Sequence, residues 1–349
     1  MAKIILTGGG SAGHCTPHLS ILPYLEKKFS DIIYIGSKNG IEKQIIQKKK
    51  ITYFEIECTK LYRKFNIKNL GIPIKLSKGI IQAGKILDKE KPSVIFSKGG
   101  YVALPVVIAG AKRNIPIITH ESDLTIGLAN KIIAKYANKI LTTFNETTVK
   151  NKNVQFVGPP INNKIFNCSK EIALKFFNLS GNKPILLITG GSQGAKTINN
   201  IVRNSLPFLL KTYDIIHLCG KNNIAPNIDV VGYKQYEFLD NIEYAYTISS
   251  VCVSRAGSNT LFELLALKKP CVIIPLPQGN SRGDQVQNAN YFYKKGMINL
   301  LEQDKLTEQT LSLAINNAFK NKQQLIKNIN DFSLASSSML IADILSSYI

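Results

Sequence analysis

Short apolar runs rich in β-branched residues recur along the chain, and each is followed by a turn and a longer stretch of helical character. Continuous apolar runs that alternate with helices are typical of parallel sheets covered on both faces. The pattern therefore predicts an α/β protein built on parallel sheets. The expected strands are residues 3–6, 31–35, 93–96, 116–119, 139–142 and 153–157, then 184–189, 214–218, 250–253 and 271–275.

The runs form two series that divide near Gly158-Pro-Pro160, and 349 residues are enough for two domains. We predict a first domain over residues 1–160, a linker near 159–165 and a second domain over 161–332. The amphipathic tail, residues 333–349, is expected to form a helix that packs back on the first domain. Each half begins with an apolar strand that ends in a glycine loop. This arrangement predicts two Rossmann-like, doubly wound domains that face each other across a cleft.

The first glycine loop, Gly8-Gly-Gly-Ser-Ala-Gly-His14, contains the G-x-G-x-x-G spacing of a dinucleotide-binding turn. That fingerprint also needs an acidic residue after the second strand, where it binds a ribose hydroxyl. Here the second strand is followed by Gly36-Ser-Lys-Asn39, and Glu42 comes well after it. We therefore assign no nicotinamide or flavin cofactor.

The second glycine loop, Gly190-Gly-Ser-Gln-Gly-Ala-Lys-Thr197, falls one glycine short of a Walker A motif because Ala195 stands in its place. A nucleotide hydrolase is therefore disfavoured. Both loops nevertheless have glycines that let the backbone approach phosphate closely, beside the N–H groups of a helix start. The second loop is thus a candidate diphosphate site, and a tight turn that binds no ligand is the alternative.

A third stretch, residues 253–263, ends a strand and opens a helix with small and hydrogen-bonding residues. Glu263 lies one turn into this helix, where its carboxylate is able to accept hydrogen bonds from both ribose hydroxyls of a nucleotide. The alternative is a capping box that joins Asn259 or Thr260 to Glu263. The stretch alone does not decide between the two.

Composition narrows the classes of protein to consider. The net charge of +21 indicates either a lysine-rich surface or attraction to a polyanion. The six cysteines are scattered without a C-x-x-C pair, which disfavours a zinc site or redox dithiol and suggests a reducing compartment. No secretory signal follows Met1-Ala-Lys3, and no uncharged apolar run approaches the ~20 residues that span a bilayer. We expect a protein of the cytosol or of a membrane surface.

Several motifs occur together, in a fixed order, over nearly the whole chain. They are Gly8-Gly-Gly-Ser-Ala-Gly-His14, Ser97-Lys-Gly-Gly-Tyr-Val-Ala-Leu-Pro105, His120-Glu121, Gly190-Gly-Ser-Gln-Gly194, Ser254-Arg-Ala-Gly257 with Glu263, and Asp284-Gln285 with Asn288-Ala289. Each motif alone is weak, but the ordered set closely resembles the MurG family, the N-acetylglucosaminyltransferases of peptidoglycan synthesis. The resemblance implies a GT-B fold. It also implies transfer of N-acetylglucosamine from UDP-GlcNAc to the C4 hydroxyl of the muramyl sugar of lipid I, giving lipid II with inversion at the anomeric carbon.

The resemblance further implies where the substrates bind, with UDP-GlcNAc on the C-terminal domain and the lipid-linked acceptor on the N-terminal domain. By resemblance, Ser192 contacts the diphosphate and Leu239 lies near the uracil. Glu263 binds the ribose, while Gln285, with Asp284 beside it, reads the sugar hydroxyls. The other expected contacts are Ser258, Asn259, Thr260, Leu261 and Phe262 for the nucleotide, and Ser11, Ala12, Gly13 and Asp123 along the donor or acceptor side of the cleft.

Two positions depart from the family's usual pattern. Family members often carry an arginine at the domain junction, near the donor, where this chain has Asn162. An amide lacks the guanidinium charge, so diphosphate binding is expected to rely more on the helix start and on Arg255 or Lys196. Asp123 stands where many members have asparagine.

Inversion requires one direct displacement, a base for the acceptor proton and stabilisation of the leaving UDP. No Asp-x-Asp occurs to hold a divalent metal, so we expect no essential metal and no cofactor. The helix dipole and the loop N–H groups after Gly190 are expected to stabilise the UDP instead. His14 is the first candidate for the base because its ordinary pKa suits proton transfer near neutrality. Glu121 is the alternative base, and hydrogen bonding without proton transfer is the alternative role for His14.

The segment over residues 60–76 mixes basic residues with large apolar ones. An apolar patch edged with lysine and arginine is what binding to an anionic lipid surface requires. We therefore expect peripheral binding to the cytoplasmic face of the membrane. The alternative is an ordinary loop and helix that packs its apolar side inward.

Two other classes of protein stay open at this point. One is another GT-B enzyme with a different acceptor, such as a diacylglycerol glycosyltransferase or a UDP-GlcNAc epimerase-like protein. The other is a non-catalytic protein that binds phosphate or nucleic acid through its positive charge. We do not expect a nucleic-acid partner, because no module of interleaved aromatic and basic residues stands out in the sequence.

Overall fold

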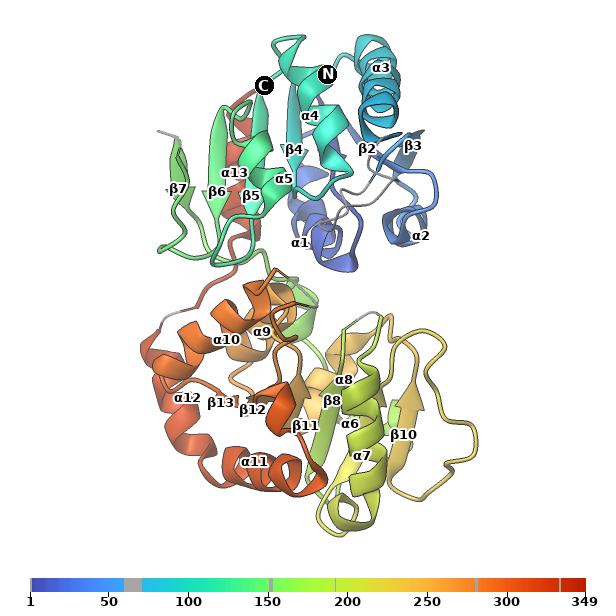
Figure 1. Ribbon diagram of the computed structural model, residues 1–349, viewed down its shortest axis with the longest axis vertical. Coiled ribbons are helices and arrows are strands. Elements are labelled where there is room, and N and C mark those ends of the chain that lie inside the picture. The colour runs from blue at the N-terminus through green and yellow to red at the C-terminus, as the bar shows by residue number, and fades with distance from the viewer. Residues whose placement is uncertain (1, 60–70, 151–152, 192, 280–281, 333) are drawn as a thin grey trace. The chain divides into compact units, whose positions relative to one another are not determined.

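The computed structural model describes residues 2–59, 71–150, 153–191, 193–279, 282–332 and 334–349. The chain divides into two compact units. The first comprises Met1–Asn162 together with Ser336–Ile349, and the second comprises Asn163–Ala335. In each unit a parallel sheet has helices on both faces (Figure 1).

The first unit contains a seven-stranded sheet with the order β3-β2-β1-β4-β5-β6-β7, in which all pairs are parallel. Its strands are β1 (Lys3–Thr7), β2 (Asp31–Ser37), β3 (Thr52–Ile56), β4 (Val94–Ser97), β5 (Ile117–Glu121), β6 (Lys139–Thr142) and β7 (Val154–Phe156). Its helices are η1 (Ala12–His14), α1 (Thr16–Leu25), α2 (Ile41–Gln47), α3 (Ile72–Glu90), α4 (Ala103–Ala111), α5 (Leu128–Ile133) and α13 (Ser338–Ser346).

The central strand β1 shows why this sheet needs helices on both faces. Ile4 and Leu6 point to one face, where they pack with residues of α1 and α13. Ile5 points to the opposite face, where it packs with residues of α3 and α4. All three side chains are fully buried, as a continuous apolar run in a parallel strand requires.

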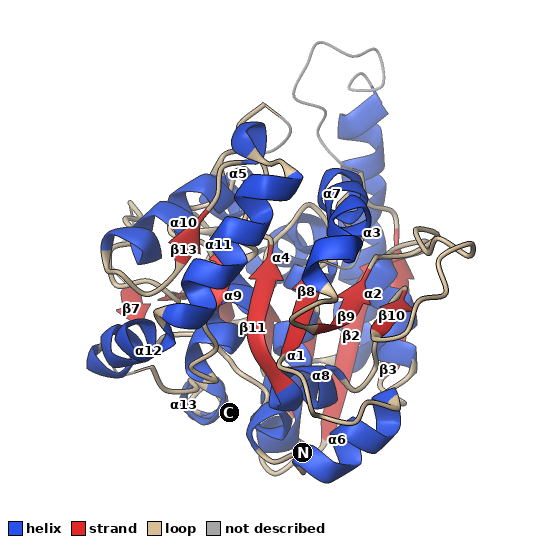
Figure 2. Ribbon diagram, turned by 90° about the horizontal axis from the view of Figure 1, so that it is seen from below, coloured by secondary structure: helices blue, strands red, loops and turns tan. Residues whose placement is uncertain are grey.

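The second unit contains a six-stranded parallel sheet with the order β10-β9-β8-β11-β12-β13. Its strands are β8 (Ile185–Thr189), β9 (Asp214–Leu218), β10 (Tyr233–Tyr236), β11 (Ser249–Ser254), β12 (Cys271–Ile273) and β13 (Asn299–Leu300). Its helices are η3 (Asn163–Phe166), α6 (Lys170–Phe177), α7 (Lys196–Leu209), α8 (Ile242–Ile248), α9 (Ser258–Ala266), α10 (Asp284–Lys294), η4 (Gln303–Lys305), α11 (Glu308–Lys320) and α12 (Lys322–Asp331). Helices α7 and α11 share one core with β8 and β11 (Figure 2).

The prediction of two parallel α/β sheets is confirmed, and all ten expected strands are present with small differences at their ends. Three further strands, β3, β10 and β13, were not predicted. All three lie at sheet edges, where a strand is paired on one side only. Such strands need no continuous apolar run, and β10 has the polar sequence Tyr-Lys-Gln-Tyr.

The chain crosses between the units at residues 162–163 and again at 335–336. Within the first unit these two crossings are tied together by serines. Ser337 Oγ donates to the Gly158 carbonyl at 3.0 Å, and Ser338 Oγ donates to the Ile161 carbonyl at 3.0 Å. The helix that follows, α13, lies in the first unit (Figure 1). It packs against α1, and Ile341 is buried in the core of this unit.

The strand order of each sheet reverses once along the chain, between β1 and β4 in the first unit and between β8 and β11 in the second. Ligands of doubly wound proteins bind outside the carboxyl ends of the strands at this reversal. The segments after these four strands are the glycine loops and their partners. The structure thus points to the same segments as the sequence motifs do.

Candidate active site

The glycine loop after β1 is filled from inside the first unit. A methyl group added at Gly8 would lie 2.6 Å from the carbonyl oxygen of His14, and one added at Gly9 would lie 2.6 Å from the carboxylate carbon of Glu42. Gly10 has a positive φ of 84°. Glycine is therefore needed here by the packing and conformation of the loop itself.

Glu42, on α2, is the residue that holds this loop. Its carboxylate is fully buried and accepts hydrogen bonds from the backbone N–H of Gly10 at 3.3 Å and of Ser37 at 3.1 Å. The carboxylate of Glu42 therefore binds backbone N–H groups of the first glycine loop and of the end of β2. In the sequence, Glu42 comes too long after the second strand to be the ribose-binding acid, and no pattern there signals this bracing role.

His14 ends the short helix η1, with its ring against the loop that follows β4. Its Nδ1 lies 3.1 Å from the backbone carbonyl oxygen of Lys98. A carbonyl oxygen can only accept, so in the neutral ring Nδ1 carries the hydrogen and Nε2 carries the lone pair. This geometry makes Nε2 the atom of His14 that is able to take a proton. Three residues before His14 are also expected to contact a substrate. Of these, Gly13 is exposed, and Ser11 and Ala12 are half-buried.

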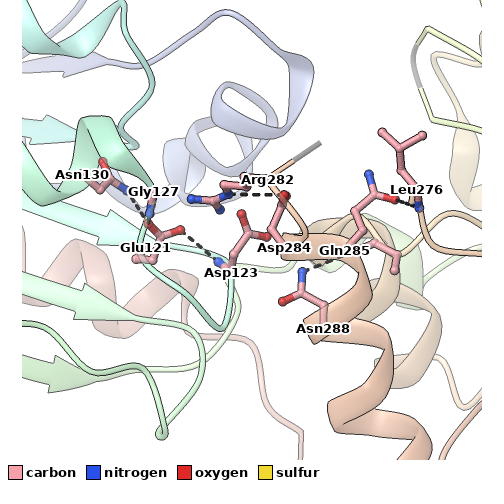
Figure 3. A network of polar contacts seen from close by, with 10 residues as sticks. Glu121, Asp123, Gly127, Asn130, Leu276, Arg282, Asp284, Gln285 and Asn288 are labelled. Atoms are coloured by element: carbon pink, nitrogen blue, oxygen red, sulfur yellow. Dashed lines mark hydrogen bonds and ion pairs between the residues drawn. The ribbon is translucent and has the colours of Figure 1, made fainter. Parts of the chain in front are cut away.

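Glu121, at the end of β5, is buried and organises the loop that follows it. Its carboxylate accepts from the backbone N–H of Asp123 and of Gly127, each at 3.0 Å, and from the side-chain amide of Asn130 at 2.9 Å (Figure 3). Both oxygens are used. This pattern favours a positioning role for Glu121 over the role of alternative base, and it places Asp123 on the ordered loop.

In the second unit, the loop after β8 leads into α7. Ser192 lies outside the described residues. Gly191 has a φ of 84°, and a methyl group added there would meet no other described atom within 4 Å. Gly194 is crowded instead, since a methyl group would lie 2.0 Å from the Cys219 carbonyl oxygen. The loop is therefore fixed at one end and open at Gly191.

Helix α9 begins at Ser258, and its N-cap is Gly257, which has no side chain to cap it. Thr260 lies inside the helix, so the capping box from Asn259 or Thr260 to Glu263 is wrong. Leu261 and Phe262 are 0% and 2% exposed and pack in the core. Any contact of these two residues with the nucleotide would therefore be made by their backbone, and their expected role stays a prediction.

Glu263 is half-buried and paired within the unit. It accepts a hydrogen bond from the hydroxyl of Tyr246, on α8, at 2.9 Å. Burial raises the pKa of Glu263 to about 7, although the hydrogen bond from Tyr246 opposes this shift. The carboxyl group therefore changes its charge near neutral pH.

Arg255, directly after β11, is almost fully buried. Its guanidinium donates to the carbonyls of Ile274 and Pro275 at 3.0 and 3.1 Å, and to the side chain of Gln303 at 2.5 Å. Burial lowers its pKa to about 10, so the group stays charged at neutral pH. Its contacts brace the segment after β12, and any action on a diphosphate would come from its charge.

At the start of α10, Asp284 forms an ion pair with Arg282, with 3.3 Å between Oδ1 and Nε. Gln285 Oε1 accepts from the backbone N–H of Leu276 at 3.0 Å, which fixes the orientation of its amide (Figure 3). Leu239, in the segment between β10 and α8, is 7% exposed. The structure thus places the expected sugar-reading residues at a helix start with one amide already oriented.

Two doubly wound parallel units with glycine loops at their strand-order reversals define the GT-B class of fold. Solved structures support this class. The crystal structure of the Acinetobacter baumannii MurG matches with a TM-score of 0.74 at 19% identity, covering 99% of this chain and 100% of that chain. The glycosyltransferase of kitacinnamycin matches with a TM-score of 0.73 at 12% identity, covering 99% of both chains. These likenesses show the fold.

The family follows from sequence. The N-terminal domain of glycosyltransferase family 28 matches residues 4–142, and its C-terminal domain matches residues 185–343. The UDP-N-acetylglucosamine--N-acetylmuramyl-(pentapeptide) pyrophosphoryl-undecaprenol N-acetylglucosamine transferase of Clostridium botulinum is 45% identical over 98% of this chain and 97% of its own length. The transferase of the same name from Clostridium tetani is 43% identical over 99% of this chain and 98% of its own length. The chain belongs to this family of N-acetylglucosamine transferases, which confirms the resemblance drawn from the motifs.

Proposed function

We propose that this protein transfers N-acetylglucosamine from UDP-GlcNAc to the C4 hydroxyl of the muramyl sugar of lipid I, with inversion, giving lipid II for peptidoglycan synthesis. The observation that carries the proposal is identity of 43–45% over nearly the whole chain with curated transferases of this name. The motif residues of both units occur in the order that the resemblance requires.

The donor is assigned to the second unit. The first turn of α9, the loop after β8 and the start of α10 lie at or beside the strand-order reversal, and Gly191 and Gly257 leave room for a ligand next to the backbone. Helix starts and glycine loops stabilise phosphate charge through backbone N–H groups. We assign the uridine ribose to Glu263 and the sugar hydroxyls to Gln285 and Asp284.

The acceptor is assigned to the first unit, with His14 Nε2 as the base that takes the proton of the C4 hydroxyl. The new bond forms between that oxygen and the anomeric carbon while the bond to UDP breaks, so UDP leaves with the electron pair. Backbone N–H groups of the second unit then stabilise its charge. We expect no essential metal. Loss of turnover in EDTA that Mg²⁺ restores, with presentation of the lipid held constant, would overturn this part.

Membrane binding is assigned to α3 and the preceding segment. No helix among the described residues is long and apolar enough to cross a bilayer. Residues 60–70 lie outside the described residues, but on α3 Ile74 and Ile81 are 74% and 61% exposed, with exposed Lys78 and Lys85 on the same face. An exposed apolar face edged with lysines suits an anionic lipid surface, which we take to be the cytoplasmic face of the membrane.

Sedimentation with vesicles containing phosphatidylglycerol tests the membrane assignment. Changing Lys78 and Lys85 together to glutamate should weaken binding by about 30-fold or more, because each lysine lost near the surface costs about 1 kcal/mol. The control changes Lys320 and Lys327, exposed on α11 and α12, to glutamate and therefore alters the net charge equally. Equal loss of binding in both variants would show a non-specific charge effect and overturn the assignment.

The transferase proposal itself is tested with labelled UDP-GlcNAc and two acceptors, a lipid I analogue and diacylglycerol. Label should move to the lipid I analogue and give a product with the inverted anomeric configuration. Transfer to diacylglycerol alone would assign the protein to another GT-B activity. Absence of transfer to both, with bound UDP-GlcNAc, would overturn the proposal.

A further inference from the structure

A buried cluster of basic groups lies behind the first glycine loop. Three of the chain's four histidines, His14, His18 and His120, lie around Lys98, directly after β4. A methyl group added at Gly8 would lie 2.6 Å from the His14 carbonyl oxygen, 3.1 Å from Lys98 Cβ and 3.3 Å from His18 Cε1. The cluster is thus packed tightly against the loop that carries the proposed base.

Lys98 connects three elements of the first unit. Its backbone N–H donates to the Thr7 carbonyl at 2.9 Å, and its own carbonyl accepts from His14 Nδ1 at 3.1 Å. Its ammonium donates to Ser122 Oγ at 2.7 Å and to Nδ1 of His120. The side chain is only 1% exposed, so it is unable to touch a substrate. Any effect on the reaction must pass through its neighbours.

The neighbouring histidines are neutral. Burial holds the pKa of His120 well below its usual range, and the charge of Lys98 lowers it further. The same two causes, in the same order, hold the pKa of His18 well below its usual range. His18 is fully buried, and its ring nitrogens have no hydrogen-bond partner among the described residues. Among the charged groups, Lys98 is the one that lowers the pKa of both buried histidines most.

We propose that Lys98 is a positioning residue for His14. Its carbonyl fixes which ring nitrogen of His14 carries the hydrogen, and its buried ammonium opposes protonation of that ring, so that His14 stays a base near neutral pH. This inference rests on the proposed function of His14. The acidic groups that face the cluster are Glu121 and Asp123, which act on Lys98, and Glu42, which holds the glycine loop.

The charge is present in the pH range where it matters. Burial lowers the pKa of Lys98 to about 7, against the opposing charges of Glu121 and Asp123. Lys98 is therefore charged below neutrality, where a histidine at its ordinary pKa would take up a proton. Inside a protein such a charge is weakly screened, and its repulsion of a second cation extends over several ångströms.

The test is the titration of His14, followed by NMR of protein with ¹³C-labelled histidine and assigned with a His14→Asn variant. Lys98→Met removes the charge and keeps a long unbranched side chain. The midpoint of His14 should then rise by about half a pH unit or more. The acid limb of kcat/KM for the transfer reaction should move in the same direction. An unchanged midpoint would overturn the proposal.

Thr143→Val is the matched control, because it removes the hydroxyl 3.3 Å from His120 Nε2 and leaves the Lys98 charge in place. The His14 midpoint should not move, and a shift as large as that of Lys98→Met would show a general packing effect instead.

If Lys98→Met does not fold, Ser122→Ala takes its place. Losing this acceptor disfavours the charged form of Lys98, so the midpoint should again rise, and no rise overturns the proposal. The titration needs no substrate, so its failure is distinguishable from a failure to transfer the sugar.

Discussion

Strands β4 and β11 occupy the same place in their two sheets, next to β1 and β8, and they end in similar sequences. The two sequences are Ser97-Lys-Gly-Gly100 and Ser254-Arg-Ala-Gly257. Both consist of a serine, a basic residue, a small residue and a glycine, in that order. Both cations are buried and hydrogen-bonded inside their own unit. The two strand ends thus share one design up to the final glycine.

The difference lies in the space around that glycine. A methyl group added at Gly100 would lie 2.5 Å from the Gly9 carbonyl oxygen, and Gly100 has a φ of 78°. Gly257 has a φ of −66°, and a methyl group there would meet no other described atom within 4 Å. Neither packing nor backbone conformation requires glycine at 257, whereas both require it at 100. The comparison indicates that the first unit is closed for precise positioning of His14, and that the second unit is open for a ligand.

The largest effect, on kcat, is expected when the proposed base on the first glycine loop is removed. His14→Ala should lower kcat by about 10²–10⁴-fold, the usual contribution of a general base. The KM for UDP-GlcNAc should stay near the wild-type value, because the donor is assigned to the other unit. Steady-state kinetics with the lipid I analogue measures both constants. A correctly folded variant with nearly full kcat would remove His14 from the role of base.

The next largest effect is on folding stability, when a methyl group is added at Gly8 or at Gly257. Gly8→Ala should cost about 1–3 kcal/mol of folding stability, because its methyl group collides with a backbone carbonyl. Gly257→Ala should leave stability nearly unchanged, because the gain of about 0.4–1 kcal/mol from a stiffer unfolded chain is offset by the preference for glycine over alanine at an N-cap. Urea unfolding measures both variants.

Gly257→Ala is also expected to weaken binding of the donor. Gly257→Ala should raise the KM for UDP-GlcNAc by about tenfold, the effect of about 1.4 kcal/mol of lost binding. If instead Gly257→Ala destabilises the fold and leaves donor binding intact, the open glycine has a structural role and the comparison fails.

The smallest effect concerns two groups whose pKa values desolvation shifts to near neutrality, one in each unit. Glu263, with a pKa of about 7 against an ordinary value of 4.5, binds more protons in the folded state between these values, so its contribution to stability is lost as pH rises through 7. Lys98, with a pKa of about 7 against 10.5, binds fewer protons in the folded state, so its contribution is lost as pH falls from 10.5 to 7.

The two replacements should therefore respond to pH in opposite directions. Relative to wild type, Glu263→Gln should gain free energy of unfolding as pH rises from 5 to about 7.5. Lys98→Met should lose it as pH rises from 7 to about 10. Denaturant unfolding across this range measures the two differences, and curves that stay parallel to the wild-type curve would contradict the assigned shifts.

The central strands of both sheets could be predicted because a strand buried on both faces must be apolar along its length. Strands β3, β10 and β13 could not, because β10 is polar, β13 has only two residues, and Thr52 and Glu55 interrupt the apolar pattern of β3. In the site, the glycine loops and Glu263 were visible as motifs. The roles of Glu42 and Lys98 were not, because their partners are brought to them only by folding.

The packing of the residues at the start of α9 could not be predicted from the sequence either. Thr260 and Glu263 have the spacing of a capping box, yet α9 begins two residues before Thr260 and Glu263 pairs with Tyr246 of the preceding helix. Leu261 and Phe262 stand next to motif residues but are turned into the core. Spacing identifies which helix carries the site, and packing decides which of its faces is available.

Hydrogen–deuterium exchange of the full chain, with and without saturating UDP-GlcNAc, tests the comparison most directly. The account predicts that the strongest protection on binding the donor falls on the segments after β8 and β11 and at the start of α10. Protection centred on residues 8–14, with none over residues 255–263, would place the donor on the closed loop and contradict the account.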